Sequence, residues 1–203
     1  MTIDVAIKHL NKDKKLAKII KEFGMYKIRV TRNKYKSLVE AIITQQLSGP
    51  AAKTISTRFK ALYDVRFPTP AKVIDTPNAK LRKTGLSKTK VGYIKDLSKR
   101  IESKDLRLER LPRLSDEEII DELTKVRGIG RWTAEMFLIF TLGRMDVLPV
   151  GDLGVKKGIM MLHSMSELPS EKYMIDIAEK WRPYRTVATW YLWKSLKNFD
   201  PTE

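Results

Sequence analysis

The stretch that decides the fold covers residues 123–134 and reads Leu-Thr-Lys-Val-Arg-Gly-Ile-Gly-Arg-Trp-Thr-Ala. Leu123 and Val126 are apolar anchors that close one helical pattern. Gly128 and Gly130 mark a tight turn, in which the backbone can approach another group without a Cβ in the way. A helix that begins directly after such a turn presents unpaired N–H groups and the positive end of its dipole, which together bind a phosphate. The stretch therefore predicts two helices joined by a phosphate-binding turn.

Hydrophobic residues recur with helical spacing along most of the remaining chain. Ser115 with Glu118 predicts a capping box at the helix that leads into the turn, and Ser37 with Glu40 predicts another nearer the N-terminus. Residues 27–31 alternate weakly and are interpreted as a short extended piece. Because no repeat, linker or low-complexity tract interrupts the helical spacing, we expect an all-α fold.

The charge balance indicates a polyanionic partner. The chain of 203 residues carries 40 Lys and Arg against 24 Asp and Glu, a formal net charge of +16. Lys and Arg displace the counterions that condense on a nucleic-acid backbone, so nucleic acid is the first candidate. A Lys-rich surface of a thermophile or an acidophile would also give this excess. Basic runs at 80–90 and 95–104 are interpreted as sources of backbone affinity only.

Two absences in the sequence narrow the class of protein. The chain has no cysteine, which excludes disulfides, thiol nucleophiles and cysteine-ligated iron–sulfur clusters. Residues 1–12 are charged and lack the apolar core of a secretory signal, and no apolar stretch approaches the roughly 18 residues of a membrane span. We expect a soluble, intracellular protein with no membrane partner.

The hairpin stretch is part of a larger pattern. Its segment Gly-Ile-Gly-Arg-Trp-Thr-Ala resembles the helix-hairpin-helix of DNA repair and replication proteins, in the form found in alkylation-repair glycosylases. Residues 146–158 then read Asp-Val-Leu-Pro-Val-Gly-Asp-Leu-Gly-Val-Lys-Lys-Gly, which resembles the Gly/Pro-rich loop that carries the catalytic aspartate of these enzymes. The chain therefore resembles the HhH-GPD superfamily of DNA glycosylases, in the short alkyladenine form without an N-terminal β domain.

The resemblance covers about residues 35–196 and implies a fold with two helical lobes on either side of a DNA-binding cleft. On this family analogy, residues 1–35 pair with 157–203 in a terminal lobe. Residues 36–156 form a central helical barrel, with the helix-hairpin-helix at about 115–142. The cleft between the lobes is expected to hold the catalytic carboxylate.

Asp152 is the residue that the resemblance makes catalytic. Loss of a base leaves an oxocarbenium-like sugar, which a fixed carboxylate stabilises while it orients or deprotonates the attacking water. Aspartate is also a favoured helix N-cap, so Asp152 could cap the helix that follows it. The two roles are compatible.

Position 132 decides the subclass that the resemblance implies. In bifunctional relatives the matching residue is a lysine, which attacks the sugar and supports strand cleavage through a Schiff base. Here it is Trp132, and Arg131 cannot replace the amine because a guanidinium stays protonated. We therefore expect a monofunctional enzyme that leaves the abasic site intact.

Tryptophans are the candidates for a base-binding pocket. By analogy with the family, Trp132 and Trp193 line it, and an electron-rich pocket suits a flipped base that carries positive charge. N-alkylated purines are such bases, and their charge makes them good leaving groups that need no general acid. Core packing is the alternative interpretation for the C-terminal tryptophans.

The segment Gln45-Gln46-Leu47-Ser48 matches the family loop that fills the gap left by an extruded nucleotide. Gln46 is the first candidate for this wedge, because its amide can hydrogen-bond the orphaned partner base. Leu47 is the second and would only stack. The alternative is a helix end without a function.

The family hairpin also contacts the DNA backbone and holds a monovalent cation through main-chain carbonyls. By position, the residues at the DNA backbone are Gly128, Gly130, Arg131 and Thr133. The carbonyls that would bind Na⁺ or K⁺ are those of Thr124, Val126 and Gly128. The resemblance implies no cofactor for the chemistry and no iron–sulfur cluster.

The sequence thus predicts a monomeric DNA glycosylase of base excision repair, which acts on double-stranded DNA that contains an alkylated purine such as 3-methyladenine. Its location would be the cytoplasm, with the nucleoid, in a prokaryote, or the nucleus in a eukaryote. Two alternatives stay open: a glycosylase for another lesion, such as uracil or hypoxanthine, and a non-catalytic helix-hairpin-helix module that only binds DNA.

Overall fold

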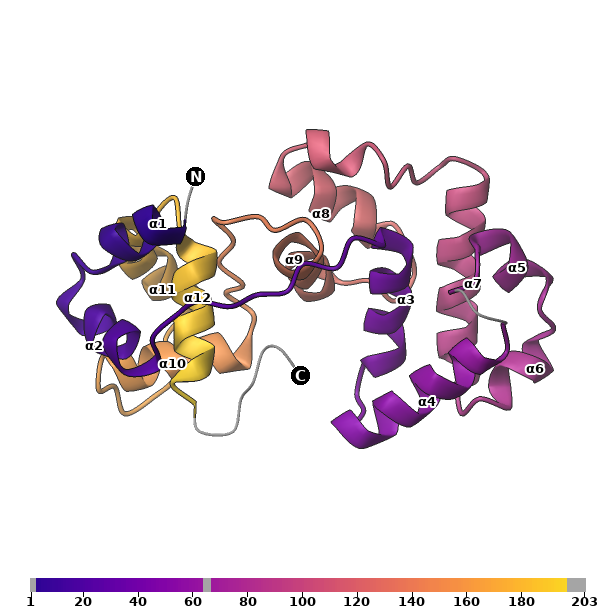
Figure 1. The fold of residues 1–203 in the computed structure, drawn as a ribbon, viewed down its shortest axis with the longest axis horizontal. Helices are drawn as coiled ribbons and strands as arrows, with labels where there is room; N and C mark the ends of the chain where they lie inside the picture. Colours follow the sequence, from indigo (N-terminus) through magenta and orange to yellow (C-terminus); the bar gives the residue numbers. More distant parts are fainter. Residues whose placement is uncertain (1–2, 64–66, 197–203) are drawn as a thin grey trace. The chain divides into compact units, whose positions relative to one another are not determined.

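The computed structural model describes residues 3–63 and 67–196, and Figure 1 traces the chain. All regular structure in these residues is helical, which confirms the all-α prediction. The helices are α1 (Ile3–Leu10), α2 (Lys14–Phe23), α3 (Lys34–Thr44), α4 (Gly49–Ala61), α5 (Pro70–Asp75), α6 (Asn78–Arg82), α7 (Lys88–Glu102), η1 (Leu111–Arg113), α8 (Asp116–Thr124), α9 (Arg131–Phe140), α10 (Leu153–Leu162), α11 (Glu171–Ala178), η2 (Glu179–Trp181) and α12 (Arg185–Lys194). No helix in the described ranges is both long and apolar enough to span a bilayer.

The chain divides into two compact units. The terminal unit joins Met1–Val30 to Leu138–Glu203, and the central unit is Thr31–Phe137. The sequence-based boundaries were 35/36 and 156/157, and the structure places them at 30/31 and 137/138. The second boundary differs most, because the segment between the hairpin and α10 is hydrogen-bonded to α12. Asp152 therefore belongs to the terminal unit.

Helix α12 forms the centre of the terminal unit and packs against α1, α2 and α10 (Figure 1). Every side chain from Thr186 to Trp193 is buried. Helix α10 approaches α12 closely at Gly158, where a Cβ would lie 2.8 Å from Leu192 Cβ and 2.9 Å from the Leu192 carbonyl oxygen. A glycine is therefore required at this crossing, since the obstacle is partly backbone.

Helix α7 organises the central unit and packs against α3, α5 and α6. Its buried face carries Val91, Ile94 and Leu97. Polar contacts add to this packing: Ser98 and Tyr35 of α3 share a hydrogen bond of 2.7 Å, and Lys95 donates to the Ile74 carbonyl at 3.0 Å. This helix also supports the segments that were predicted to contact DNA.

The helix starts test the capping predictions. The capping box of Ser115 with Glu118 is confirmed, because each side chain bonds the other residue's backbone N–H. The box predicted at Ser37 is wrong: α3 begins at Lys34, and the Asn33 side chain accepts from Lys36 N–H at 2.9 Å. Asparagine is among the strongest N-caps and precedes the apolar pattern of α3, so the helix starts there. Residues 27–31 form neither helix nor strand.

Candidate active site and DNA-binding hairpin

Asp152 is the N-cap of α10. Its backbone is extended, with φ −77° and ψ 122°, and its Oδ1 accepts a hydrogen bond from Val155 N–H at 2.8 Å. Trp193 Nε1 donates to the same oxygen at 2.9 Å. The capping role is thus confirmed, and two donors that lie far apart in the sequence fix the orientation of this carboxylate.

The Trp193 side chain is held firmly in its place. It is only 1% exposed, and its ring stacks on Phe140 with centroids 5.8 Å apart and an interplanar angle of 17°. Gly154 leaves room for it, since a Cβ there would lie 2.9 Å from Trp193 Cδ1 and 3.0 Å from Asp152 Oδ1. The structure therefore places Trp193 beside Asp152 as a hydrogen-bond donor. Its contact with a flipped base stays a prediction.

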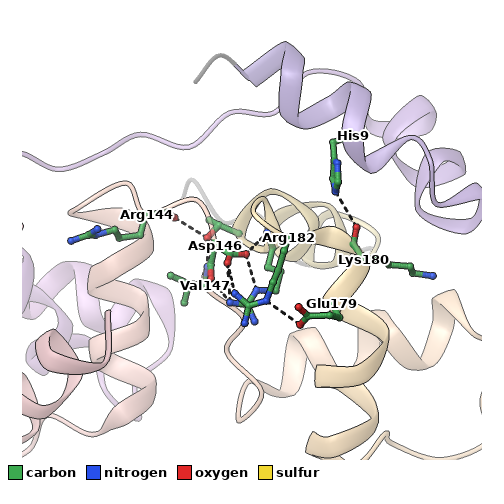
Figure 2. A network of polar contacts seen from close by, with 9 residues as sticks. His9, Arg144, Asp146, Val147, Glu179, Lys180 and Arg182 are labelled. Atoms are coloured by element: carbon green, nitrogen blue, oxygen red, sulfur yellow. Dashed lines mark hydrogen bonds and ion pairs between the residues drawn. The ribbon is translucent and has the colours of Figure 1, made fainter. Parts of the chain in front are cut away.

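The loop that leads to Asp152 is anchored at its start by Asp146, in a network drawn in Figure 2. Arg182 donates to Asp146 Oδ2 at 2.7 Å, and Arg185 Nε donates to Asp146 Oδ1 at 2.7 Å. Arg185 also donates to the Asp146 carbonyl at 2.8 Å. These arginines precede and open α12, so ion pairs tie the loop to the helix that carries Trp193.

Thr186 forms uncharged hydrogen bonds with the start of the same loop. Its hydroxyl donates to the Arg144 carbonyl at 2.7 Å and accepts from Val147 N–H at 2.9 Å, while its N–H donates to the Met145 carbonyl at 2.9 Å. The first turn of α12 therefore holds the beginning of the loop, and Trp193 in its last turn holds the end. One rigid helix thus positions the candidate catalytic carboxylate from both sides.

The predicted hairpin is present in the central unit, between α8 and α9. Leu123, Val126 and Ile129 are buried beneath the turn. Gly128 has φ +85°, a conformation that side chains disfavour, and a Cβ there would lie 2.1 Å from Tyr93 Cδ2. Gly130 has open space at its Cβ position. The two glycines therefore differ: one is needed for the fold of the turn, and the other leaves its surface open.

Helix α7 also holds the hairpin by charge. Asp96 accepts from Arg127 N–H at 3.1 Å, from Arg127 Nε at 3.2 Å and from Arg100 Nε at 3.2 Å. Burial alone would raise the pKa of Asp96, but the hydrogen bonds and charges of these arginines lower it below its ordinary value. The carboxylate therefore stays ionised and fixes the turn to α7.

The first residues of α9 have different environments. The Arg131 guanidinium binds Glu117 through two hydrogen bonds of 2.6 and 3.0 Å, and its Nε donates to the buried Glu135 at 3.2 Å. The hydrogen bond from Arg131 holds the pKa of Glu117 below its ordinary value. Trp132 is 48% exposed, whereas the Thr133 side chain is buried. Arg131 thus braces α8 against α9, and Trp132 presents an accessible ring.

The candidate wedge loop follows α3. Gln46 is exposed and has φ +55°, and Leu47 is 38% exposed. Gln45 differs from both, because its side chain is partly buried and donates from Nε2 to the Gly128 carbonyl at 2.8 Å. The structure therefore presents Gln46 and Leu47 outward and uses Gln45 to bind the hairpin turn.

The pattern of hairpin, loop and capping aspartate matches a known family. Residues 39–183 match the model of the "HhH-GPD superfamily base excision DNA repair protein". The chain belongs to this superfamily.

Relatives support the assignment over nearly the whole HhH-GPD chain. The DNA-3-methyladenine glycosylase 1 of Schizosaccharomyces pombe is 37% identical over 94% of this chain and 84% of its own length. The structure of the 3-methyladenine DNA glycosylase of this yeast with abasic DNA matches with a TM-score of 0.86, 37% identity and coverage of 98% and 99% of the two chains. A DNA-3-methyladenine glycosidase from Bacillus halodurans matches with a TM-score of 0.84, 36% identity and coverage of 92% and 86%.

The HhH-GPD hairpin also offers the carbonyls that were predicted to bind a monovalent cation. The Val126 carbonyl accepts from Ile129 N–H at 3.1 Å, and the Gly128 carbonyl accepts from Gln45 Nε2 at 2.8 Å. A carbonyl oxygen has two lone pairs, so each keeps one that a cation could use. The Thr124 carbonyl is the third predicted donor, and neutral carbonyl oxygens are the kind of donor that Na⁺ or K⁺ accepts, so binding of the ion stays a prediction.

Sequence reasoning missed several residues that support this HhH-GPD site. Asp96, Asp146 and Thr186 each bind a segment distant in the sequence, and although Asp146 opens the quoted loop, the sequence does not show its arginine partners near the start of α12. Tyr93 is only partly buried and lies outside the apolar face of α7, so the sequence does not show that its ring covers a glycine.

Proposed function

We propose that this chain is a monofunctional DNA glycosylase of base excision repair, which hydrolyses the N-glycosidic bond of alkylated, cationic purines and leaves an abasic site. The observation that carries the proposal is the Asp152 carboxylate, which an N–H of α10 and the Trp193 indole hold in one orientation. The names of the relatives, DNA-3-methyladenine glycosylases, support an alkylated purine as the substrate.

Asp152 performs the chemistry in this proposal. As the bond to the base breaks, positive charge develops on the sugar, and a carboxylate already held in place stabilises it without reorganisation. The same carboxylate orients the water that attacks the sugar. A cationic purine leaves as a neutral base, so no protonation of the leaving group is needed. Asp152 therefore suffices as the acidic catalytic residue.

Trp132 supports both the choice of substrate and the absence of strand cleavage. An exposed indole offers a face on which an electron-poor, flipped base can stack. The position that carries a nucleophilic lysine in bifunctional relatives holds no amine here, so no Schiff base forms at it.

The hairpin and the wedge loop would bind the DNA. The N–H groups at the start of α9 face no acceptor within their own helix and can hold a phosphate. Arg131 contributes through its N–H, because its guanidinium is engaged by carboxylates. Na⁺ or K⁺ on the carbonyls of Thr124, Val126 and Gly128 would add positive charge near that phosphate. Gln46 fills the gap that the flipped nucleotide leaves.

The proposal is tested by base release. We expect the protein to liberate 3-methyladenine from methylated double-stranded DNA, detected by chromatography, and to leave abasic sites that break only on heating in alkali. Borohydride trapping should give no covalent protein–DNA adduct. Duplexes that contain uracil or hypoxanthine serve as the comparison for other lesions. Tight DNA binding without release of any of these bases would identify a non-catalytic binder instead.

Trp193→Phe tests the support of the carboxylate. We expect a fall of roughly 10-fold in the single-turnover rate of base release, since one hydrogen bond to a charged group is lost, with DNA affinity unchanged. Trp181→Phe is the matched control, because Trp181 is equally buried and donates to Asp13 at 2.9 Å. Both variants should lose similar stability by thermal melting. An equal loss of rate in the two would contradict the role given to Trp193.

A further inference from the structure

One lysine of helix α7 binds the start of the wedge loop, where the loop leaves α3. Lys90 Nζ donates to the Ile43 carbonyl at 2.8 Å and to the Gln45 carbonyl at 2.6 Å. These carbonyls lie at the C-terminal end of α3, where the last carbonyls lack donors within the helix and the dipole favours a cation. Lys90 therefore closes the end of α3.

Lys90 differs from the solvated lysines that surround it. The side chain is partly buried, and burial lowers its pKa below the ordinary value. A partly buried ammonium has to recover its lost hydration from protein acceptors. The two carbonyls of the α3 end supply them, so Lys90 acts within the fold, although its sequence context is a basic run.

The same helix holds the hairpin turn. The Tyr93 ring covers Gly128, and Asp96 accepts from Arg127 N–H at 3.1 Å. Gln45 then joins the two supported segments directly, because its Nε2 donates to the Gly128 carbonyl at 2.8 Å. Wedge loop and hairpin turn are thus each tied to α7 and also to each other.

The residue that follows this junction has a strained backbone. Gln46 has φ +55°, which costs free energy for a residue with a Cβ and persists where neighbouring contacts enforce it. On one side, Leu47 N–H donates to the Thr44 carbonyl at 3.2 Å. On the other side stands Gln45, fixed through both its carbonyl and its side chain. These contacts fix the backbone from which the exposed Gln46 side chain projects.

We propose that Lys90 and Gln45 are positioning residues, which set the wedge residue Gln46 at a fixed place relative to the phosphate-binding hairpin. The inference rests on the proposed function and deepens it. Because the wedge loop and the hairpin are joined, binding of a backbone phosphate by the hairpin also brings Gln46 to the duplex. Gln45 itself does not enter the DNA.

The test measures wedge insertion without base release. In Asp152→Asn protein, the added changes are Lys90→Met and Gln45→Met, and the probe is a duplex with 2-aminopurine beside an abasic analogue. We expect the 2-aminopurine fluorescence change on binding to fall about 10-fold, since the loss of these hydrogen bonds lowers the population of the correctly placed loop by about that factor. Affinity for undamaged duplex should change less than about 3-fold, because the hairpin stays held by Asp96.

Two further variants serve as controls. Lys36→Met removes the same charge from α3 and should leave the fluorescence change intact. Lys90→Arg keeps a cation that can donate to both carbonyls. We expect this variant to retain about half or more of the 2-aminopurine fluorescence change. If Lys90→Met fails to fold, Gln45→Met keeps the test decisive, because it removes the bond to the Gly128 carbonyl and should lose the signal as well. Full loss of signal in Lys36→Met, or a full signal in both Lys90→Met and Gln45→Met, would overturn the proposal.

A double-mutant comparison separates positioning from a general loss of structure. If Lys90 acts through Gln46, Lys90→Met should cause no further loss in a Gln46→Ala background. Multiplying losses would show that Lys90 acts elsewhere. The outcome is independent of catalysis: if the parent protein releases no base but its wedge signal depends on Lys90 and Gln45, the proposed function fails and the positioning role stands.

Discussion

Asp152→Asn protein is expected to fold and to bind DNA, but to release alkylated base at least about 100-fold more slowly than the parent. Asparagine has the size of aspartate and is an equally good N-cap, so its oxygen can still accept from Val155 N–H and from the Trp193 indole. What disappears is the negative charge that faces the sugar as the glycosidic bond breaks. The loss therefore reports on electrostatic stabilisation and not on the fold.

The measurement is the single-turnover rate of 3-methyladenine release with enzyme in excess, beside duplex affinity and the melting temperature. Asp176→Asn is the matched control, because Asp176 is an exposed residue of α11 in the same unit and loses the same charge. It should behave like the parent in all three assays. A parental rate in Asp152→Asn would reduce Asp152 to a helix cap and leave only DNA binding.

Local patterns predicted much of this site. The Gly-Ile-Gly turn, the capping box at Ser115 and the cap at Asp152 each depend on residues a few positions apart, and sequence spacing describes such features well. The predicted start of α3 was wrong, and the reason is also local. Two acceptable caps, Asn33 and Ser37, compete there, and the earlier one bonds the backbone.

The orientation of the site side chains was harder to predict than which residues belong to the site. Trp193 was predicted to stack on a base with its aromatic face. In the structure its indole N–H donates a hydrogen bond to Asp152, which lies 41 positions away in the sequence. Gln45 and Gln46 are identical in type, but the positive φ of Gln46 turns one amide outward while the other reaches the hairpin. Arg131 was expected at the DNA backbone, and Glu117 and Glu135 engage its guanidinium. The contacts of Trp193 and Gln45 depend on long-range packing, which spacing alone does not encode, whereas Glu135 lies one helical turn from Arg131 and their pairing follows from the spacing.

Gly128→Ala is expected to have the largest effect on stability among the hairpin variants. A methyl group at φ +85° costs about 1–2 kcal/mol in backbone strain. It would also lie 2.1–2.5 Å from the Tyr93 ring, and such overpacking adds about 1–3 kcal/mol. We therefore expect a loss of about 2–5 kcal/mol in the free energy of unfolding. The distorted turn should also bind duplex DNA at least about 10-fold more weakly.

Gly130→Ala is the matched control for Gly128→Ala. A Cβ added at Gly130 has no atom within 4 Å, and the backbone of Gly130 does not have a positive φ. Denaturant unfolding should show parental stability for Gly130→Ala and a clear loss for Gly128→Ala. If Gly130→Ala nevertheless weakens DNA binding, the phosphate approaches that glycine closely, and the two residues serve the hairpin differently, one through its fold and the other through its surface. Equal stability of the two variants would mean that the turn absorbs both the backbone strain and the contact with Tyr93, and it would contradict the role given to Gly128.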